Sequence, residues 1–407
     1  MWRRPGYAAA ALCLVAGGAS CSDRPPAAAP ASVAAPPAAP ASSAPAPSAS
    51  ASASASAPAD CVTGTLGGMS VEERAGQALM IGTPVGSPRQ LEASVRRYRL
   101  GGVFLAGRST RPASALRADI AALRGASPVP PLVAIDQEGG NVQTLKGDDF
   151  PRMPTAERLG RGPQDGLRDA VRDSAQRLHG IGVTVNLAPV ADTVPASIGV
   201  GNPPIGAFHR QYGSNPAEVA GDVGTAVTAS QGEGVLTVLK HFPGLGRVRA
   251  NTDVSRDAVD ATTTATDPYL QPFAAGIRAG SAGVMVSSAR YPRLDRGSIA
   301  TYSKPIITGL LRERLGYDGL VMSDDVGAAD AAAIMPVGER AVRFVAAGGD
   351  MVLTIRPQDA GPMAEALAAE ARRTPAFDAR LSDAARHVLA AKDRAGLLPC
   401  SKTQSLP

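Results

Sequence analysis

The chain has 407 residues, of which 19% are charged and 4% aromatic, and this length suits one large globular domain or two small ones. Its formal net charge is +5, and it is +3 (39 basic against 36 acidic residues) without Arg3 and Arg4, which lie in a segment expected to be removed. Because no run of Lys and Arg accompanies this small excess, the composition argues against a nucleic-acid partner.

The first 20 residues have the pattern of an export signal. After a basic start, Ala8–Val15 is an apolar stretch too short to remain in a bilayer as a spanning helix. Small residues then precede Cys21, and the segment resembles a bacterial lipoprotein signal with Cys21 as the lipid-carrying residue, although Gly18 stands where Leu is usual. A plain secretory signal is the alternative. Both predict an extracytoplasmic protein, either lipid-anchored to the cell membrane or secreted.

Residues 21–60 are predicted to be a disordered tether, because Pro25–Ala59 is almost entirely Ala, Pro and Ser and cannot form a packed core. Residues 61–400 then form the globular domain, and residues 401–407 form a short tail. Cys61 and Cys400 flank that domain, and an extracytoplasmic disulfide between them would tie its two ends together. Two free thiols are the alternative.

From about Val62 onward, short apolar runs alternate with amphipathic stretches. Eight runs indicate buried strands: Ala78–Gly82, Gly102–Ala106, Pro131–Ile135, Val183–Ala188, Val235–Leu239, Gly283–Val286, Leu320–Met322 and Met351–Ile355. Helices are expected over Ala113–Leu123, Leu167–Leu178, Pro216–Ser230, Tyr269–Ala279, Lys304–Leu315, Val337–Ala347, Pro362–Arg373 and Ser382–Ala395. Strands that are apolar throughout and separated by helices indicate a parallel sheet. Eight such units predict an α/β fold, a (β/α)8 TIM-type barrel forming a single catalytic domain.

Polar side chains follow five of these strands, at the point where each strand ends. Barrel enzymes build their sites from the carboxyl ends of the strands, so this distribution predicts an enzyme pocket. The residues are Asp136 and Glu138, Asp192, Lys240 and His241, Ser287 and Ser288, and Asp324 and Asp325.

The residue types predict a functional role for some of these positions. A Lys is rarely buried without a partner, so Lys240 and His241 are expected to face a polar cavity. Asp136, the first residue beyond its strand, is placed to bind hydroxyls of a sugar-like ligand, unless it and its neighbour form internal salt bridges. Because side chains alternate along a strand, only one of Asp324 and Asp325 is expected to face the cavity as a rigidly held nucleophile, while the other caps the next segment.

Three motifs carry a resemblance to a known family: Asp136–Gly140 (DQEGG), Lys240–Gly244 (KHFPG) and Ser323–Asp325 (SDD). Together they resemble glycoside hydrolase family 3, and more narrowly its single-domain bacterial β-N-acetylglucosaminidases. The likeness extends over about Met69–Ala395, and residues 205–213 are similar to the family's arginine-bearing loop, with Arg210 in the substrate-binding place.

The resemblance implies a retaining exo-glycosidase that removes terminal β-linked N-acetylglucosamine from peptidoglycan-type fragments. Asp324 would be the nucleophile that forms a covalent glycosyl-enzyme intermediate. Four residues would hold the hydroxyls of the terminal sugar: Asp136, Arg210, Lys240 and His241. This chemistry needs no metal and no organic cofactor.

The chain departs from the family pattern in two places. The family carries an Asp–Ser–His triplet whose histidine is the acid/base, whereas the same spacing from Lys240 reaches Asn251–Asp253 here. Asp253 is the predicted acid/base, because a carboxylic acid can do this work if its pKa is raised; Asp257 and His241 are the other candidates. After the glycine pair, Asn141 and Thr144 stand where the family has basic residues, and this leaves the recognised sugar open.

The sequence leaves two rival functions open, and it leaves the roles of three histidines open as well. The rivals are a β-glucosidase or other exo-glycosidase of the same family, and an inactive lipoprotein that binds cell-wall sugars. The altered Asn251–Asp253 loop favours the inactive binder, and the intact Ser323–Asp325 motif argues against it.

His209 either lines the pocket or is a loop residue, His179 is interpreted as a helix-end residue, and His387 as a surface or packing residue.

Overall fold

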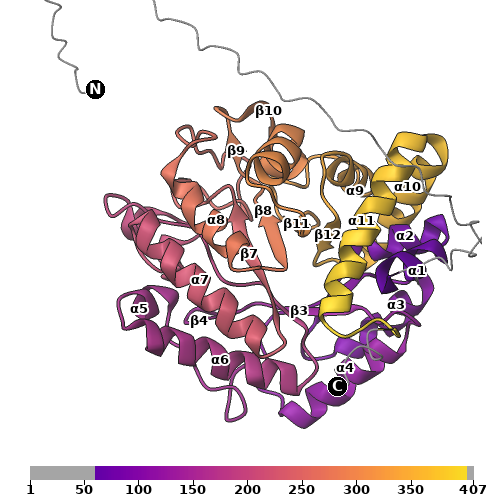
Figure 1. Cartoon of the computed structure of the whole chain (residues 1–407), viewed down its shortest axis with the longest axis horizontal. Coiled ribbons are helices and arrows are strands. Elements are labelled where there is room, and N and C mark those ends of the chain that lie inside the picture. The colour runs from indigo at the N-terminus through magenta and orange to yellow at the C-terminus, as the bar shows by residue number, and fades with distance from the viewer. Residues whose placement is uncertain (1–59, 401–407) are drawn as a thin grey trace, which may run out of the picture. The chain divides into compact units, whose positions relative to one another are not determined.

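The computed structural model in Figure 1 describes residues 60–400 and has a closed barrel of parallel strands at its centre. In chain order around the barrel the strands are β1 (Leu79–Pro84), β2 (Gly102–Ala106), β3 (Leu132–Ile135), β6 (Val185–Asn186), β7 (Leu236–Phe242), β8 (Gly283–Val286), β11 (Leu320–Asp325) and β12 (Met351–Thr354). The pairing of β12 with β1 closes the ring. The predicted (β/α)8 fold is therefore confirmed. The predictions for the signal, the tether, the tail and Cys21 lie outside the described residues.

Helices surround the barrel. The α-helices are α1 (Cys61–Gly67), α2 (Val71–Gln77), α3 (Glu92–Tyr98), α4 (Ala113–Gly125), α5 (Ala156–Gly160), α6 (Gln164–Gly180), α7 (Pro216–Gly232), α8 (Gln271–Arg278), α9 (Val337–Ala346), α10 (Ala360–Arg373) and α11 (Pro375–Arg394). The predicted list lacked α1, α2, α3 and α5, although α2 begins with a reciprocal capping box between Ser70 and Glu73. Within residues 60–400, no helix is both long enough and apolar enough to cross a membrane.

Short elements complete the chain. The 3₁₀ turns are η1 (Pro88–Leu91), η2 (Gly199–Gly201), η3 (Gly206–Phe208), η4 (Pro268–Leu270), η5 (Ala300–Tyr302) and η7 (Pro357–Asp359). The segment expected as an amphipathic helix over 304–315 is a π-helix, η6 (Pro305–Arg314). Two antiparallel hairpins lie outside the barrel, β4 (Gln137–Gly139) with β5 (Val142–Gln143), and β9 (Arg290–Tyr291) with β10 (Asp295–Ile299).

Three barrel strands, β1, β7 and β11, end later than predicted, and the extensions of β7 and β11 carry site residues. The prediction ended β7 at Leu239, but the strand continues to Phe242, because the Ala191 N–H donates to the Lys240 carbonyl at 2.8 Å and Phe242 still pairs with β8. Likewise β11 runs on to Asp325, which pairs with β12. Lys240, His241 and Asp324 therefore lie within paired strands. A rigid strand positions a side chain more accurately than a free loop does.

Helix α11 covers the end of the barrel at which the strands begin. Its residues Val388 and Ala391 belong to the apolar cluster that fills the barrel interior. Lys392 donates to Gln77, just before β1, and Arg394 donates to the Gly280 carbonyl, just before β8. The predicted site lies at the opposite end of the barrel, where the strands terminate.

A buried charge network lies beside α11. Asp350, directly before β12, is fully buried and pairs with Arg312 at 2.6 Å and with Arg380. His387 also donates to Asp350, from Nδ1 at 3.0 Å, and its side chain is only 2% exposed. The surface interpretation of His387 is therefore wrong and the packing interpretation is confirmed. The ring is buried because it hydrogen-bonds to Asp350, a charged partner 37 residues away. His179 lies in the last turn of α6 as expected.

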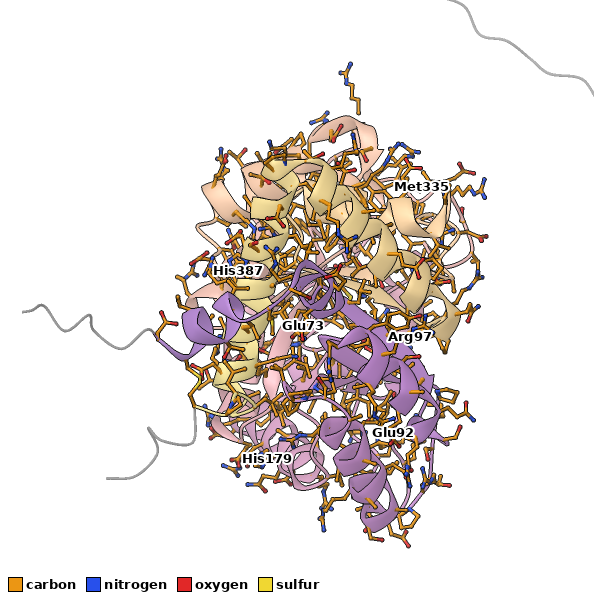
Figure 2. The ribbon with its side chains drawn as sticks, turned by 90° about the vertical axis from the view of Figure 1, so that its right-hand side faces the viewer. Glu73, Glu92, Arg97, His179, Met335 and His387 are labelled. Atoms are coloured by element: carbon orange, nitrogen blue, oxygen red, sulfur yellow. A yellow bond between two sulfur atoms is a disulfide. The ribbon has the colours of Figure 1, made fainter. Side chains whose placement is uncertain are left out.

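The two ends of the domain meet at a disulfide. Cys61 and Cys400 are bonded, with their Cα atoms 5.7 Å apart, so the first of the two alternatives for these cysteines is the one in the structure. Helices α1 and α2 pack against α10 and α11, which brings the first and last helices of the domain side by side (Figures 1 and 2). Figure 2 shows Glu73 on one side of this junction and His387 on the other.

Loss of this disulfide is expected to lower stability without touching the site. In the Cys61→Ser, Cys400→Ser double variant, the unfolded chain is freed from a loop closed over a sequence separation of 339 residues. We expect the free energy of unfolding to fall by about 2–4 kcal/mol. Urea unfolding of the oxidised wild type, the reduced wild type and the variant measures the change. Equal midpoints for all three would contradict it.

Candidate active site

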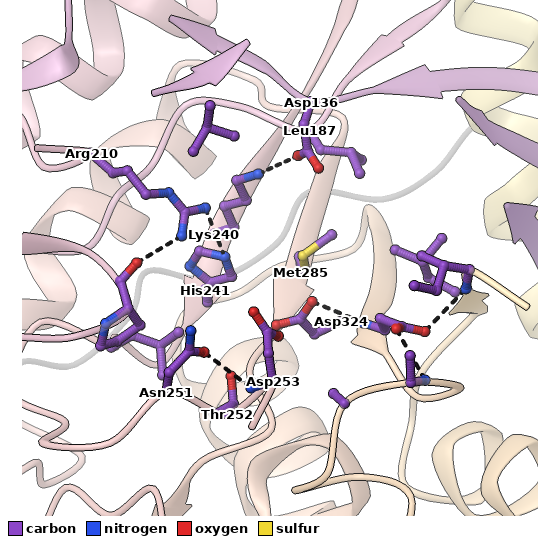
Figure 3. Close-up of a pocket in the computed structure, with 18 of the residues that line it drawn as sticks. Asp136, Leu187, Arg210, Lys240, His241, Asn251, Thr252, Asp253, Met285 and Asp324 are labelled. Carbon is purple, nitrogen blue, oxygen red and sulfur yellow. Dashed lines mark hydrogen bonds and ion pairs between the residues drawn. The ribbon is translucent and has the colours of Figure 1, made fainter. Parts of the chain in front are cut away.

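The predicted site residues come together at the carboxyl ends of the strands. A pocket with a cavity volume of about 420 Å³ is lined by all six of them: Asp136, Arg210, Lys240, His241, Asp253 and Asp324 (Figure 3). Apolar side chains of the barrel interior also reach the pocket, namely Phe104, Leu187, Met285 and Leu353. Such a pocket offers charged partners to polar groups and apolar surface to the face of a ring.

Lys240 has two carboxylate partners at one end of the pocket. Its Nζ lies 2.6 Å from Asp136 Oδ1 and 2.6 Å from Glu138 Oε1, and its side chain is only 3% exposed. Burial by itself lowers the pKa of Lys240, but the charges of Asp136 and Glu138 more than compensate and raise it above its ordinary value. Lys240 is therefore a fixed cation. The expectation that this Lys faces a polar cavity with partners is confirmed.

Arg210 reaches the same cluster from the loop after β6. Its Nε and Nη2 donate to the two oxygens of Glu138 at 2.8 and 2.7 Å, a bidentate pair, and its Nη1 donates to the Pro204 carbonyl at 2.9 Å. Burial alone raises the pKa of Glu138, yet the charges of Arg210 and Lys240 lower it to about 2. Glu138 is thus ionised and holds both cations.

Asp192 orients His241. The buried carboxylate accepts the Nδ1–H of His241 at 2.7 Å, and it also accepts the backbone N–H of His241 at 3.2 Å and that of Leu245 at 2.6 Å. The other ring nitrogen, Nε2, is 3.5 Å from Arg210 Nη2. With Nδ1 as the donor, Nε2 is the acceptor of the ring, and it accepts from Arg210 at the pocket lining.

Glu138 and Asp192 lie at predicted strand ends, but the sequence predicts no separate role for either of them. The available signal for Glu138 was its spacing: Asp136 and Glu138 are two apart in an extended segment, which places both side chains on one face. For Asp192 no local signal existed, because its partner His241 is 49 residues further along the chain. Salt bridges by these carboxylates, raised as an alternative to sugar binding, do occur, and Asp136 also lines the pocket.

Asp324 and Asp325 have different environments. Asp325 accepts the backbone N–H groups of Gly327, Ala328 and Ile355 at 2.9–3.1 Å, so it caps the segment that follows β11, as expected of one member of the pair. Among residues 60–400, Asp324 accepts only the Asp325 N–H, at 2.8 Å, and its carboxyl group faces the pocket (Figure 3).

The pKa of Asp324 is raised to about 6. Burial makes the largest contribution, the nearby His241 opposes it, and the negative charge of Asp253 adds to it. A carboxyl with this pKa is mostly ionised at neutral pH. It also has few hydrogen-bond donors, and a carboxylate with few donors keeps its oxygens available to attack a carbon atom.

Asp253 lies on the loop after β7 and points toward Asp324 (Figure 3). The start of this loop crosses the segment after β6 so closely that a Cβ at Gly246 would lie 1.8 Å from the Thr193 carbonyl oxygen, which explains the glycine. Asn251 accepts the Asp253 N–H at 3.0 Å and so shapes the turn. Asp257 does not line the pocket, whereas Asp253 and His241 do.

Three further predicted positions lie outside the pocket lining. His209 pairs with Glu157 through Nδ1 at 2.6 Å, which places it as a loop residue. Asn141 donates to the Phe208 carbonyl at 3.3 Å, and Thr144 is buried with its N–H on the Asp136 carbonyl. In the part of the chain that the structure describes, no group of three or more His, Cys, Asp or Glu side chains is arranged to hold a metal ion.

A closed parallel barrel with carboxylates and fixed cations at the carboxyl ends of its strands is the architecture of a barrel enzyme. Residues 70–391 match the glycosyl hydrolase family 3 N-terminal domain, a stretch that spans nearly all of the barrel. The chain belongs to this family and is a glycoside hydrolase.

Solved structures and sequences of relatives agree with this assignment. A β-N-acetylhexosaminidase structure from Beutenbergia cavernae is 42% identical with a TM-score of 0.77, over 80% of this chain and 98% of that one. A family 3 β-N-acetylglucosaminidase structure from Paenibacillus sp. is 27% identical with a TM-score of 0.73, over 81% of this chain and 63% of that one. A β-hexosaminidase sequence from Stenotrophomonas maltophilia is 34% identical over 58% of this chain and 71% of the relative.

Proposed function

We propose that the enzyme is a retaining exo-β-N-acetylglucosaminidase with Asp324 as nucleophile and Asp253 as acid/base. The similarity to β-N-acetylhexosaminidases supports the terminal N-acetylhexosamine as the sugar removed. The observation that carries the mechanism is the arrangement of Asp253 and Asp324, which face one another beside a separate cluster of hydroxyl-binding groups (Figure 3).

The two carboxyl groups divide the reaction between them. In the first step protonated Asp253 gives its proton to the glycosidic oxygen, while an Asp324 oxygen attacks C1, so that the C1–O bond breaks and an ester to Asp324 forms. In the second step ionised Asp253 takes a proton from water, the water oxygen attacks C1, and the ester breaks. The proton returns to Asp253 and the sugar leaves with its original anomeric configuration.

The charged cluster at the other end of the pocket positions the sugar. Asp136 accepts hydrogen bonds from hydroxyls, and Arg210 and Lys240 donate them. Nε2 of His241, whose contact with Arg210 is long at 3.5 Å, accepts one from a hydroxyl in its place. Because Glu138 and Asp192 hold these donors and acceptors in place before substrate arrives, little ordering remains to be done on binding. A sugar fixed at this end presents C1 to Asp324.

The raised pKa of Asp324 predicts that activity falls at a higher pH, on the acidic side of the pH profile, than it would with an ordinary Asp as nucleophile. The nucleophile must be ionised, and a group with a pKa of about 6 is protonated below that pH, whereas an ordinary Asp stays ionised down to about pH 4. We therefore expect kcat/KM to fall about tenfold per unit below pH 6. Initial rates between pH 3.5 and 8, with circular dichroism to show that the fold persists, measure this. A limb near pH 4 would contradict the assignment.

The natural substrate and location form a further part of the proposal. The export pattern before Cys21 supports a lipid-anchored enzyme outside the cytoplasm that acts on peptidoglycan-type fragments. Expression of wild type and Cys21→Ser, followed by fractionation, tests the anchor, since only the wild type is expected in the membrane fraction. Muropeptides from purified cell wall test the substrate, with released N-acetylglucosamine as the product.

Turnover of two aryl glycosides tests the activity itself. We expect the domain to hydrolyse an aryl β-N-acetylglucosaminide faster than the matching aryl β-glucoside. The reverse order would favour the β-glucosidase alternative. Sugar binding by calorimetry without turnover of either substrate would favour the inactive binder and overturn the proposal.

A further inference from the structure

The backbone of the Asp253 loop is held by a second loop. Residues 251–254 have two local hydrogen bonds, Asp253 N–H to Asn251 Oδ1 and Val254 N–H to the Asn251 carbonyl at 3.3 Å. Among the described residues, only two hydrogen bonds join this turn to another segment. Asp330 N–H donates to the Asp253 carbonyl and Ala331 N–H donates to the Thr252 carbonyl, each at 3.2 Å.

The donors belong to the loop that directly follows the nucleophile strand. This loop, residues 326–336, is fixed at its start by Asp325, which accepts two of its N–H groups. Buried Arg340 binds both ends, donating to the Val326 carbonyl at 2.7 Å and to the Met335 carbonyl at 2.8 Å. In the middle, the Tyr302 hydroxyl donates to the Ala332 carbonyl at 3.0 Å. Hydrogen bonds therefore hold this loop at both ends and in the middle, and it forms a support for the Asp253 turn.

The small side chains of this support allow close approach to the Asp253 turn. Ala329, Ala331 and Ala332 are buried. Asp253 itself is exposed, so packing around its side chain does little to hold it. The position of the Asp253 carboxyl group relative to Asp324 therefore depends on the backbone of residues 252 and 253, to which the second loop donates its hydrogen bonds.

We propose that Tyr302 and residues 328–332, here named the 302/328–332 clamp, are positioning residues that set the place of the Asp253 carboxyl group relative to Asp324. The inference rests on the proposed role of Asp253 as acid/base. In a retaining glycosidase both carboxyls must reach the same glycosidic bond, and a shift of about 1 Å reduces the rate by about 100-fold. The clamp links the end of β11 to the Asp253 turn and so couples the two groups directly.

Two substitutions weaken the clamp. Ala331→Pro removes the N–H that binds the Thr252 carbonyl, and Ala331→Gly, which keeps that N–H, is its control. Tyr302→Phe removes the hydroxyl that binds the Ala332 carbonyl, and Tyr98→Phe on the remote helix α3 is its control. If Ala331→Pro fails to fold, Tyr302→Phe still tests the clamp, because it deletes a single hydroxyl.

The leaving-group dependence of kcat/KM separates positioning from general damage. An alkyl or methylumbelliferyl glycoside needs protonation of its leaving group, whereas a dinitrophenyl glycoside does not. We expect Ala331→Pro to lower kcat/KM about 10-fold to 100-fold on the poor leaving group and less than about twofold on the dinitrophenyl glycoside. In an Asp253→Ala background, Ala331→Pro is expected to have no further effect. Equal losses on both substrates, or none on either, would overturn the clamp.

The same experiment separates this inference from the assignment of Asp253. If Asp253→Ala fails to discriminate between the two leaving groups, the acid/base assignment is wrong and the clamp loses its purpose. If Asp253→Ala discriminates and the clamp variants do not, only the clamp is wrong.

Discussion

Asp324→Ala is expected to abolish turnover. Without a carboxylate opposite C1, no glycosyl-enzyme forms, and loss of the nucleophile in an enzyme that works through a covalent intermediate lowers kcat by about 100,000-fold. Steady-state assays with an aryl β-N-acetylglucosaminide measure the loss. Asp318→Asn, an exposed carboxylate before the start of the same strand, is the matched control and is expected to keep wild-type rates.

A trapping experiment locates the covalent bond. A 5-fluoro glycosyl fluoride of N-acetylglucosamine forms the ester and hydrolyses slowly, so mass spectrometry is expected to find the added sugar on the peptide that contains Asp324. The sugar on a different peptide, or an active Asp324→Ala variant, would refute the assignment.

Asp253→Ala is expected to produce the second-largest loss. Removal of a general acid lowers the rate by about 100-fold to 10,000-fold when the leaving group needs a proton. Azide needs no base to attack C1, so it is expected to restore turnover of an activated substrate and to give a glycosyl azide of retained configuration. Product analysis by nuclear magnetic resonance reads the configuration at C1.

The chain offers a matched control for this variant. Asp257 lies on the same loop, is exposed and does not line the pocket, so Asp257→Ala is expected to behave as wild type. Azide rescue of Asp257→Ala, or of a His241 variant, in place of Asp253→Ala would move the acid/base role to that residue.

Much of the fold could be predicted because its signals are local. Apolar runs such as Gly102–Ala106 and Gly283–Val286 coincide with β2 and β8, since a strand buried on both faces needs continuous apolar sequence. Strand ends were harder to predict. Lys240 and His241 are polar and follow an apolar run, yet they belong to β7, because pairing with the segment after β6 continues past the apolar residues.

The candidate site could be predicted where one residue's type and place sufficed. Asp324 and Lys240 follow apolar runs of the sequence, and this alone predicts a shared edge. Glu138 has a partner 72 residues away, and only its two-residue spacing from Asp136 is a local signal for it. The role of Asp192 depends on a partner 49 residues away, so no local pattern shows it. The same reason hides the support of Asp253, whose hydrogen-bond donors come from the loop after β11.

The bond between Cys61 and Cys400 makes the barrel domain a covalent ring. A single peptide-bond cut by a protease anywhere between the two cysteines opens that ring without releasing a fragment. Two cuts are needed before any piece can diffuse away. In surroundings rich in proteases, a molecule cut once would therefore keep all its barrel strands covalently joined.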